Sequence, residues 1–400
     1  MTGLGLAGLT LATLGGGLAF YTFGGYPLLL WVLSKGGPQQ TQSDAEFAEP
    51  QSDDSLPSVS LTVPVYNEIH QVEALLESLV ALQYPRERLQ LLVVSDGSDD
   101  GTDEVVEGWA DRGVELLRVD ARGGKGAAEN AARPHLRGDV VVNTDASIRI
   151  RPDALGPLLA PFSDPQVGVV SGRDVSVAAR RSDANTGEAG YVGYEMWVRE
   201  LETRFGGIVG ASGCFYATRR GLHQTEVPPE LSRDFAAALI ARDHGFKAVS
   251  ASDAVCYVPR TGSLSAEYRR KVRTVARGMA TLLAWRHLLN PVRDPAFAWK
   301  LWSHKICRWL LPLALLLILM GMAFLAPSHP LALLALVAGA AGMGAAGIGW
   351  LLGREDREVP MLLSAPAFFL MSNLAVVQAA GRALRGGNQR VWEPTRREEQ

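Results

Sequence analysis

The stretch VSLTVPVYNE at residues 59–68 decides the fold of this chain. Apolar and β-branched residues dominate Val59 to Val65, which predicts a buried strand that stops at the polar Tyr66-Asn67-Glu68. A second apolar run, Leu89 to Val94, ends in Ser95-Asp96-Gly97-Ser98. Apolar residues at helical spacing lie between the two runs. The pattern predicts a βαβ unit.

The same alternation continues along the chain. We expect a helix over residues 102–111, a strand over 114–119, a helix through 127–132 after a glycine-rich segment, and a strand over 140–143. Alternating strands and helices build a mostly parallel sheet with helices on both faces. The predicted fold class is therefore α/β.

Acidic residues follow the predicted strands at Glu68, Asp96 and Asp145. Ligands of open α/β sheets bind at the carboxyl ends of the strands, so we expect these three side chains at one edge. Grouped carboxylates repel each other unless a cation compensates, and Mg²⁺ prefers oxygen ligands while also bridging substrate phosphates. The sequence favours a metal-bound diphosphate there.

Charge is distributed unevenly along the 400 residues. Apolar residues make up 47% and charged residues 20%, yet residues 1–34, 309–353 and 359–381 contain no Lys, Arg, Asp or Glu. This division excludes a secreted disulfide scaffold and a disordered chain, and the net charge of −3 gives no reason to expect nucleic acid as a partner. Cys214, Cys256 and Cys307 are isolated, which favours a reduced, cytoplasmic domain.

The charge-free runs are long enough to cross a bilayer. We expect an uncleaved N-terminal anchor over 1–35 whose end at Lys35 faces the cytoplasm, and helices near 306–325 and 331–352. A third segment, 360–384, contains Pro366. Its crossing is left open, with an interfacial or re-entrant path favoured, because three crossings would place the basic tail outside.

The sequence thus predicts six regions in a multi-pass protein of the plasma or inner membrane, with its polar domain in the cytoplasm and lipid as a partner. They are an anchor (1–35), a linker (36–57), the polar domain (58–280), interfacial helices (281–305), C-terminal transmembrane segments (306–385) and a basic tail (386–400).

Several motifs of the polar domain resemble, in order, those of the family 2 glycosyltransferases, which include hyaluronan, chitin and poly-N-acetylglucosamine synthases. The resemblance implies a GT-A, Rossmann-like fold that binds a nucleotide-sugar. It covers roughly residues 59–277 and rests on PVYNE (64–68), SDGSDDGT (95–102), GKGAAEN (124–130), TDAS (144–147), GASGCFYA (210–217), LSRDF (231–235) and RKVRT (270–274).

The resemblance implies roles for individual residues. Glu68 and Asp96 would hold the nucleotide base and ribose, with Lys125 and Asn130 as further nucleotide contacts. Asp145 would bind Mg²⁺ or Mn²⁺ and the diphosphate.

On the acceptor side, Gly210 and Gly213 would line the acceptor site. Asp234 would be the general base that takes the proton of the acceptor hydroxyl. Arg270 and Arg273 would neutralise the leaving diphosphate, since a guanidinium is always charged and forked.

Three positions depart from the family pattern. Ser147 stands where a second aspartate is usual, and a hydroxyl is a poorer cation ligand than a carboxylate. Arg233 replaces an acidic residue before Asp234, and Thr274 replaces the tryptophan of processive synthases.

The resemblance predicts an inverting membrane glycosyltransferase that transfers a hexosyl or N-acetylhexosaminyl group from a nucleotide-sugar, most simply a UDP-sugar, to a lipid-linked or glycan acceptor. Single and repeated sugar addition both stay open. The alternative from another class is a catalytically inactive, nucleotide-sensing membrane protein, for which the three departures argue.

Overall fold

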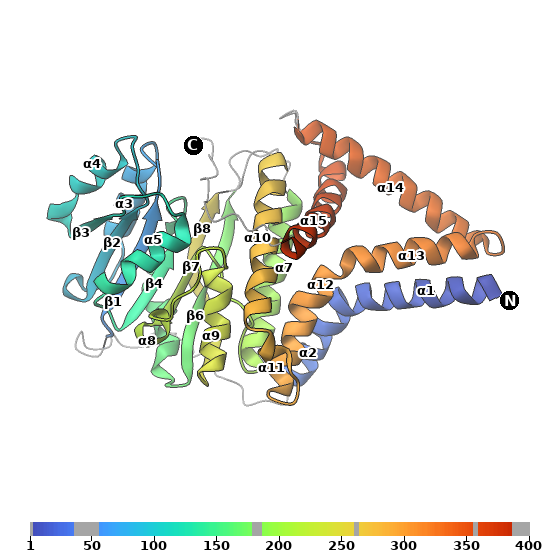
Figure 1. Ribbon diagram of the computed structural model, residues 1–400, viewed down its shortest axis with the longest axis horizontal. Helices are drawn as coiled ribbons and strands as arrows, with labels where there is room; N and C mark the ends of the chain where they lie inside the picture. The colour runs from blue at the N-terminus through green and yellow to red at the C-terminus, as the bar shows by residue number, and fades with distance from the viewer. Residues whose placement is uncertain (1–2, 36–55, 178–185, 260–263, 355–358, 386–400) are drawn as a thin grey trace.

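In the described part of the chain, eight strands form one mixed sheet in the order β3-β2-β1-β4-β7-β6-β8-β5 (Figure 1). The computed structural model describes residues 3–35, 56–177, 186–259, 264–354 and 359–385. Most of the expected linker and the whole expected basic tail lie outside these residues. The strands are β1 (Val59–Val65), β2 (Leu89–Ser95), β3 (Val114–Arg118), β4 (Val140–Thr144), β5 (Arg149–Ile150), β6 (Val167–Val177), β7 (Phe215–Arg219) and β8 (Lys247–Pro259).

The N-terminal half of the sheet is parallel, as the alternating pattern predicts. β1 pairs in parallel with both β2 and β4, and β2 with β3. All seven residues of β1 are buried, as expected for a parallel strand covered on both faces. β7 then runs antiparallel between β4 and β6, so the whole sheet is mixed.

Helices cover both faces of the sheet. One face packs against α3 (Val72–Val80), α4 (Thr102–Glu107) and α6 (Leu155–Leu159) through a core that includes Leu61 and Val63. The other face packs against α5 (Lys125–Ala132), α8 (Arg220–His223) and α9 (Arg233–Asp243). The expected α/β architecture is confirmed.

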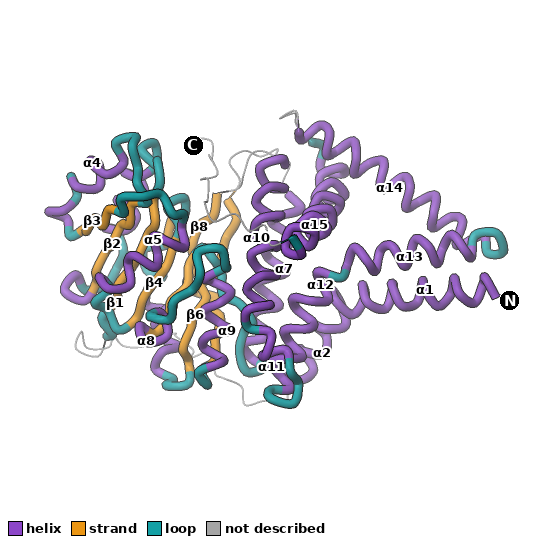
Figure 2. The backbone as a smooth tube through the Cα atoms, in the orientation of Figure 1, coloured by secondary structure: helices purple, strands orange, loops and turns teal. Residues whose placement is uncertain are grey.

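Two long helices separate the sheet from the apolar helices (Figure 1). They are α7 (Thr186–Arg204) and α10 (Leu264–Ala284). The helices beyond them are α1 (Gly3–Phe20), α2 (Tyr26–Ser34), α11 (Pro295–Leu301), α12 (Cys307–Trp309), α13 (Leu311–Leu325), α14 (Pro330–Arg354) and α15 (Met361–Leu384). Figure 2 shows strands on one side of the molecule and helices alone on the other.

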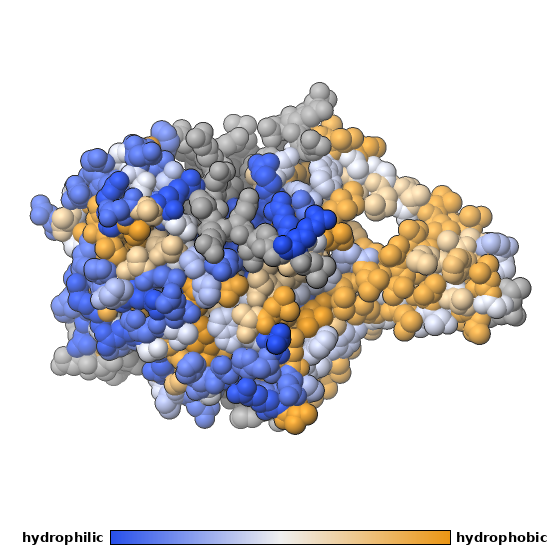
Figure 3. Space-filling view, viewed as in Figure 1, coloured by the Kyte–Doolittle hydropathy of each residue, from blue (hydrophilic) through white to orange (hydrophobic). Residues whose placement is uncertain are grey.

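Among the described residues, three helical stretches are long and apolar enough to cross a membrane: Gly3–Ser34, Pro330–Gly353 and Leu362–Ala383. Figure 3 shows apolar side chains gathered over α1, α13 and α14, while hydrophilic side chains cover much of the sheet domain. Exposed leucines such as Leu334, 64% accessible, belong to this surface. Such an apolar surface suits contact with lipid.

The prediction of a single helix over 306–325 is wrong, because the structure has two helices there, α12 and α13. Pro295–Trp309 and Leu311–Leu325 meet at 59°, and only the bent pair together is long enough for a fourth span. Pro312 follows the break directly. A proline lacks the backbone N–H and its ring clashes with the preceding turn, which explains the bend.

The last segment is one continuous helix, α15, in spite of Pro366. A re-entrant path needs a turn within the segment, and α15 has none. Helix α15 packs against α10 and α14. Whether it crosses the bilayer stays a prediction from length and composition.

Candidate active site

Hydrogen bonds join the loops that follow β1 and β2. Asn67 Nδ2 donates to Asp99 Oδ1 at 2.8 Å, and the Asp99 amide donates back to Asn67 Oδ1 at 3.0 Å. The Glu68 amide donates to Thr102 Oγ1 at 2.9 Å. These bonds fix the loop that carries Glu68 beside the loop that begins at Asp96. The Glu68 residue is 7% exposed.

Asp96 anchors the glycine-rich loop. Its two carboxylate oxygens accept hydrogen bonds from the amides of Gly123 at 2.9 Å and Gly124 at 2.7 Å. Gly124 has a φ of 86°, a left-handed conformation that favours glycine. The next residue, Lys125, begins α5. Asp96 therefore sets where the lysine enters the site.

Lys125 connects the first half of the site to the second. Its ammonium forms an ion pair with Asp145 and lies 3.8 Å from Glu129 Oε1. It also donates to the carbonyl oxygen of Gly213 at 3.3 Å. Burial alone would lower the pKa of Lys125, but the carboxylates of Asp145 and Glu129 outweigh burial and raise it, so the group stays charged.

Asp234 lies against Gly213 from the other side. A Cβ at Gly213 would stand 2.9 Å from Asp234 Oδ2, so a larger residue at this position would displace the carboxylate. Ser232 Oγ donates to Asp234 Oδ1 at 2.5 Å. Ser232 holds the N-cap position of α9, and Asp234 lies within its first turn. Asp234 is therefore not the cap of this helix.

The strand-end residues predicted from the sequence thus come together. Asp96 holds the loop that carries Lys125, and Lys125 touches both Asp145 and Gly213. Asp234 Oδ2 lies 2.9 Å from the position that a Cβ on Gly213 would take. These residues come from segments far apart in the chain and form one continuous group.

Two residues of the GKGAAEN motif, Glu129 and Asn130, bind other parts of the protein. Asn130 Nδ2 donates to the carbonyl of Val227 at 2.9 Å, and Asn130 Oδ1 accepts from Arg233. Arg233 Nε also lies 3.4 Å from Glu129 Oε2, and both charged groups are buried. Arg233, one of the departures, therefore completes a buried ion pair with Glu129, a residue that sequence reasoning did not single out.

Helix α10 carries the predicted diphosphate-binding arginines. Arg270 forms a forked ion pair with the fully buried Glu267, at 2.7 and 2.9 Å. Arg277, one turn beyond Arg273, donates to the carbonyls of Pro229 at 2.8 Å and Leu231 at 2.6 Å. Arg277 thus fixes the segment that leads into α9, a role that the motif did not indicate. Arg270 is already engaged by Glu267.

The donor set for a metal is small. Among the residues the structure describes, no three His, Cys, Asp or Glu side chains are grouped to hold an ion. Asp145 supplies one carboxylate and is paired with Lys125. Mg²⁺ is commonly held by one or two carboxylates together with substrate phosphates. The residues therefore fit an ion shared with a diphosphate, not one held by protein ligands alone.

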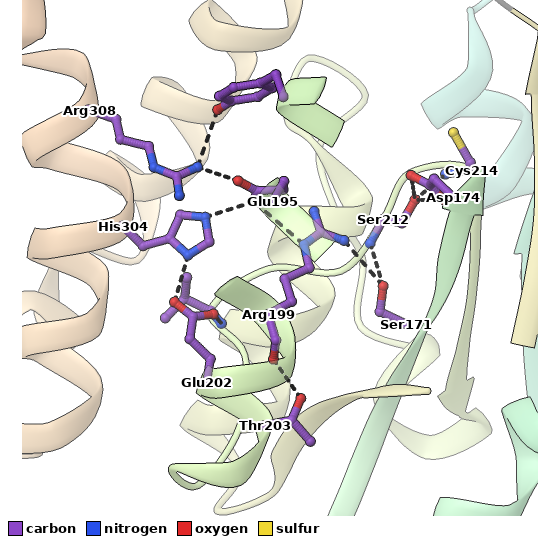
Figure 4. Close-up of polar contacts among 12 residues, drawn as sticks. Ser171, Asp174, Glu195, Arg199, Glu202, Thr203, Ser212, Cys214, His304 and Arg308 are labelled. Carbon is purple, nitrogen blue, oxygen red and sulfur yellow. Dashed lines mark hydrogen bonds and ion pairs between the residues drawn. The ribbon is translucent and has the colours of Figure 1, made fainter. Parts of the chain in front are cut away.

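A buried polar network, absent from the sequence predictions, joins the sheet domain to the segment that leads into the apolar helix α13 (Figure 4). His304 Nδ1 lies 2.6 Å from Glu202 Oε1 and His304 Nε2 lies 2.7 Å from Glu195 Oε1. Arg308 pairs with Glu195, and Tyr26 donates to Glu202 at 2.5 Å. The only sequence feature that could have indicated this network is the presence of His304 and Arg308 directly before an apolar run.

The network's carboxylates are ionised. Burial raises the pKa of Glu195, but Arg308 and His304 outweigh burial and hold it well below the usual value. Burial likewise raises the pKa of Glu202, and His304 outweighs it.

Comparisons with known proteins found similar sequences and a similar fold. Residues 60–225 match the sequence model of "Glycosyl transferase family 2". A beta-monoglucosyldiacylglycerol synthase of Trichormus variabilis is 28% identical over 170 residues, 42% of this chain and 36% of that protein. An N-acetylglucosaminyltransferase of a Rhizobium species is 28% identical over 291 residues, 66% of this chain and 63% of that protein.

The chain thus spans about a third of the first relative and under two thirds of the second. In structure, a mannosyltransferase from Pyrobaculum calidifontis, solved with GDP-Man and Mn²⁺, has a TM-score of 0.67 at 23% identity, covering 95% of this chain and 99% of that one. This likeness concerns the fold and includes the apolar helices. Residues 60–225 are therefore similar in sequence to glycosyl transferase family 2, and the polar domain has a GT-A fold.

Proposed function

We propose that this protein is an inverting glycosyltransferase of the cell membrane that transfers a sugar from a nucleotide-sugar to an acceptor hydroxyl at the cytoplasmic face. One observation carries the proposal: Lys125 contacts Asp145 and the carbonyl oxygen of Gly213, and Asp234 Oδ2 lies 2.9 Å from the position that a Cβ on Gly213 would take. The ammonium group of Lys125, beside the predicted diphosphate site, is therefore close to the carboxylate of Asp234, which is suited to be a base.

In the proposed reaction, Asp234 accepts the proton of the acceptor hydroxyl. The acceptor oxygen forms a bond to the anomeric carbon as the bond from that carbon to the diphosphate oxygen breaks. The electron pair leaves with the diphosphate, and attack opposite the leaving group inverts the anomeric centre.

Positive charge next to the leaving diphosphate lowers the barrier, because the charge that develops there is stabilised in place. We assign this role to Lys125 and Arg273. Mg²⁺ or Mn²⁺ held by Asp145 would add Lewis-acid stabilisation of the diphosphate. Glu68 and Asp96 would bind the nucleoside, Asp96 also through the loop it anchors.

The donor, the acceptor and the orientation in the membrane belong to this proposal. A UDP-sugar is the first candidate donor, and a GDP-sugar the second, since the structurally similar mannosyltransferase holds GDP-Man. The relatives' names include transfer to a lipid and transfer of N-acetylglucosamine. Both suit a site next to apolar helices, so a lipid-linked or glycan acceptor is proposed.

The test is a panel of nucleotide-sugars offered to the purified full-length chain with membrane lipid extract, scoring free nucleotide with and without a chelator. We expect one donor to be turned over, and chelation to reduce the turnover. Sizing of the labelled product separates single from repeated addition. Tight nucleotide binding without turnover of any donor would contradict the proposal and favour a nucleotide sensor.

A further inference from the structure

The buried network extends from His304 and Arg308 to Ser212, the residue before Gly213 of the proposed site (Figure 4). Glu195, on α7, contacts Arg308 of α12 and His304 just before it. One helical turn later on α7, Arg199 Nε lies 3.5 Å from Glu195 Oε1. Arg199 is 8% exposed, so this ion pair is shielded from solvent.

Arg199 reaches the sheet at Ser171, on β6. Arg199 Nη1 donates to Ser171 Oγ at 3.3 Å, and the Ser212 amide donates to the same oxygen at 2.9 Å. Ser212 Oγ lies 2.6 and 2.7 Å from the two carboxylate oxygens of Asp174. Ser171 and Ser212 are both buried, so the backbone at Ser212 is fixed from two sides.

The next peptide unit belongs to the proposed site. Gly213 follows Ser212 and accepts a hydrogen bond from Lys125, and a Cβ at Gly213 would stand 2.9 Å from Asp234 Oδ2. A displacement of Ser212 therefore displaces the surface that lies between the cation and the proposed base. Within the part of the chain that the structure describes, Glu195 and Arg199 form no hydrogen bond or ion pair with Lys125, Asp145 or Asp234, so their effect acts through Ser212.

We propose that Glu195 and Arg199 are positioning residues for sugar transfer. They tie the Ser212-Gly213 segment, through Ser171, to His304 and Arg308 at the base of the membrane helices. This inference rests on the proposed function. Misplacement of reacting groups by about 1 Å costs up to roughly 100-fold in rate. Loss of these contacts should therefore lower the rate of sugar transfer measurably.

The test compares Arg199→Met with Arg199→Lys in the full-length protein. Methionine keeps the aliphatic stem and removes the charge, so we expect kcat to fall on the order of 10- to 100-fold with donor KM within about twofold. Lysine restores a cation beside Glu195, and part of the activity returns. Arg204→Met is the matched control, because Arg204 pairs with Glu200 at 3.2 Å on the exposed part of the same helix.

A second variant and a second measurement keep the inference testable if Arg199→Met does not fold. Ser171→Ala removes only the oxygen shared by Arg199 and the Ser212 amide. In either variant we expect faster amide hydrogen exchange in peptides covering 210–214, a readout that needs no activity. Wild-type turnover and wild-type exchange in both variants would overturn the inference, whereas absence of turnover in the wild-type protein contradicts the proposed function instead.

Discussion

Gly213 is the residue at which the two halves of the site meet. We expect Gly213→Ala to reduce turnover by at least about tenfold, because the new Cβ would lie 2.9 Å from Asp234 Oδ2 and push the carboxylate away. Gly221→Ala is the control, since no atom lies within 4 Å of its Cβ position. Initial rates under saturating donor measure the effect. Equal rates for both variants would show that the contact has no functional importance.

His223 makes stability depend on pH. Burial lowers its pKa from 6.5 to about 3, and the charges of Arg233 and Arg133 act in the same direction. Below pH 6.5 the unfolded chain binds a proton that the folded chain does not, so stability falls as pH falls, by about 1.4 kcal/mol per pH unit until the folded pKa is reached. Thermal unfolding in detergent between pH 7 and 5 measures this.

The variant His223→Gln removes the titrating group and keeps a polar partner for Asn143, whose Oδ1 lies 3.2 Å from His223 Nε2. We expect its melting temperature to vary less with pH than that of the wild-type protein. The same slope in both proteins would assign the pH dependence to other groups.

At this scale, the sequence predicted residues that follow strands directly, since strand ends converge by topology. Asp96 and Asp145 are of this kind, although their roles stay predictions. The partners of Asn130 and Arg233 were not predictable, because Val227 and Glu129 lie about 100 residues away in the chain and no periodicity connects them.

Among the elements, α5 and α9 are held together by the buried pair of Glu129 and Arg233. We expect Arg233→Met to destabilise the protein by up to about 3–5 kcal/mol, because it leaves a buried carboxylate with one cation fewer. Adding Glu129→Gln removes that charge and restores part of the stability. Thermal or denaturant unfolding of the single and double variants checks this, and a double variant as unstable as the single one contradicts it.

The packing of α1 against α13 depends on glycine. A Cβ at Gly321 would lie 2.5 Å from the amide nitrogen of Ala12 and 2.6 Å from the carbonyl oxygen of Gly8. Small residues allow such close approach between membrane helices. We expect Gly321→Leu to separate the two helices and lower the melting temperature in detergent.

Gly16→Leu serves as the control for that experiment, because Gly16 lies on α1 with nothing within 4 Å of its Cβ position. It should leave the melting temperature close to that of the wild-type protein. An equal loss in both variants would show that side-chain size in the membrane matters more than this contact.

Elements with a strong local signal were predicted well. The strand over 59–65 has the same bounds in the structure, since its apolar run ends where polar residues begin. The bend before α13 was missed because hydropathy does not register Pro312 within an apolar run. The antiparallel insertion of β7 was missed because strand direction depends on long-range pairing.

For the whole molecule, the uneven charge of the sequence already divided the chain into a sheet domain and an apolar part. The structure adds the connection between them, which is the ion network around Glu195 and Glu202 rather than an apolar contact alone (Figure 4). Buried ion pairs require exact partners, and removing one partner is costly. This connection fixes the site relative to the apolar helices.

The most direct test of the account compares wild-type protein with Asp234→Asn on the donor that the panel identifies. Removal of a general base typically costs roughly 10²- to 10⁴-fold, so we expect the variant to lose turnover to that extent. Nucleotide binding, measured by calorimetry with the same nucleotide, should be unchanged because Asp234 acts on the acceptor. Retained turnover in Asp234→Asn would contradict the proposed base, and loss of nucleotide binding together with turnover would contradict the proposed division of the site.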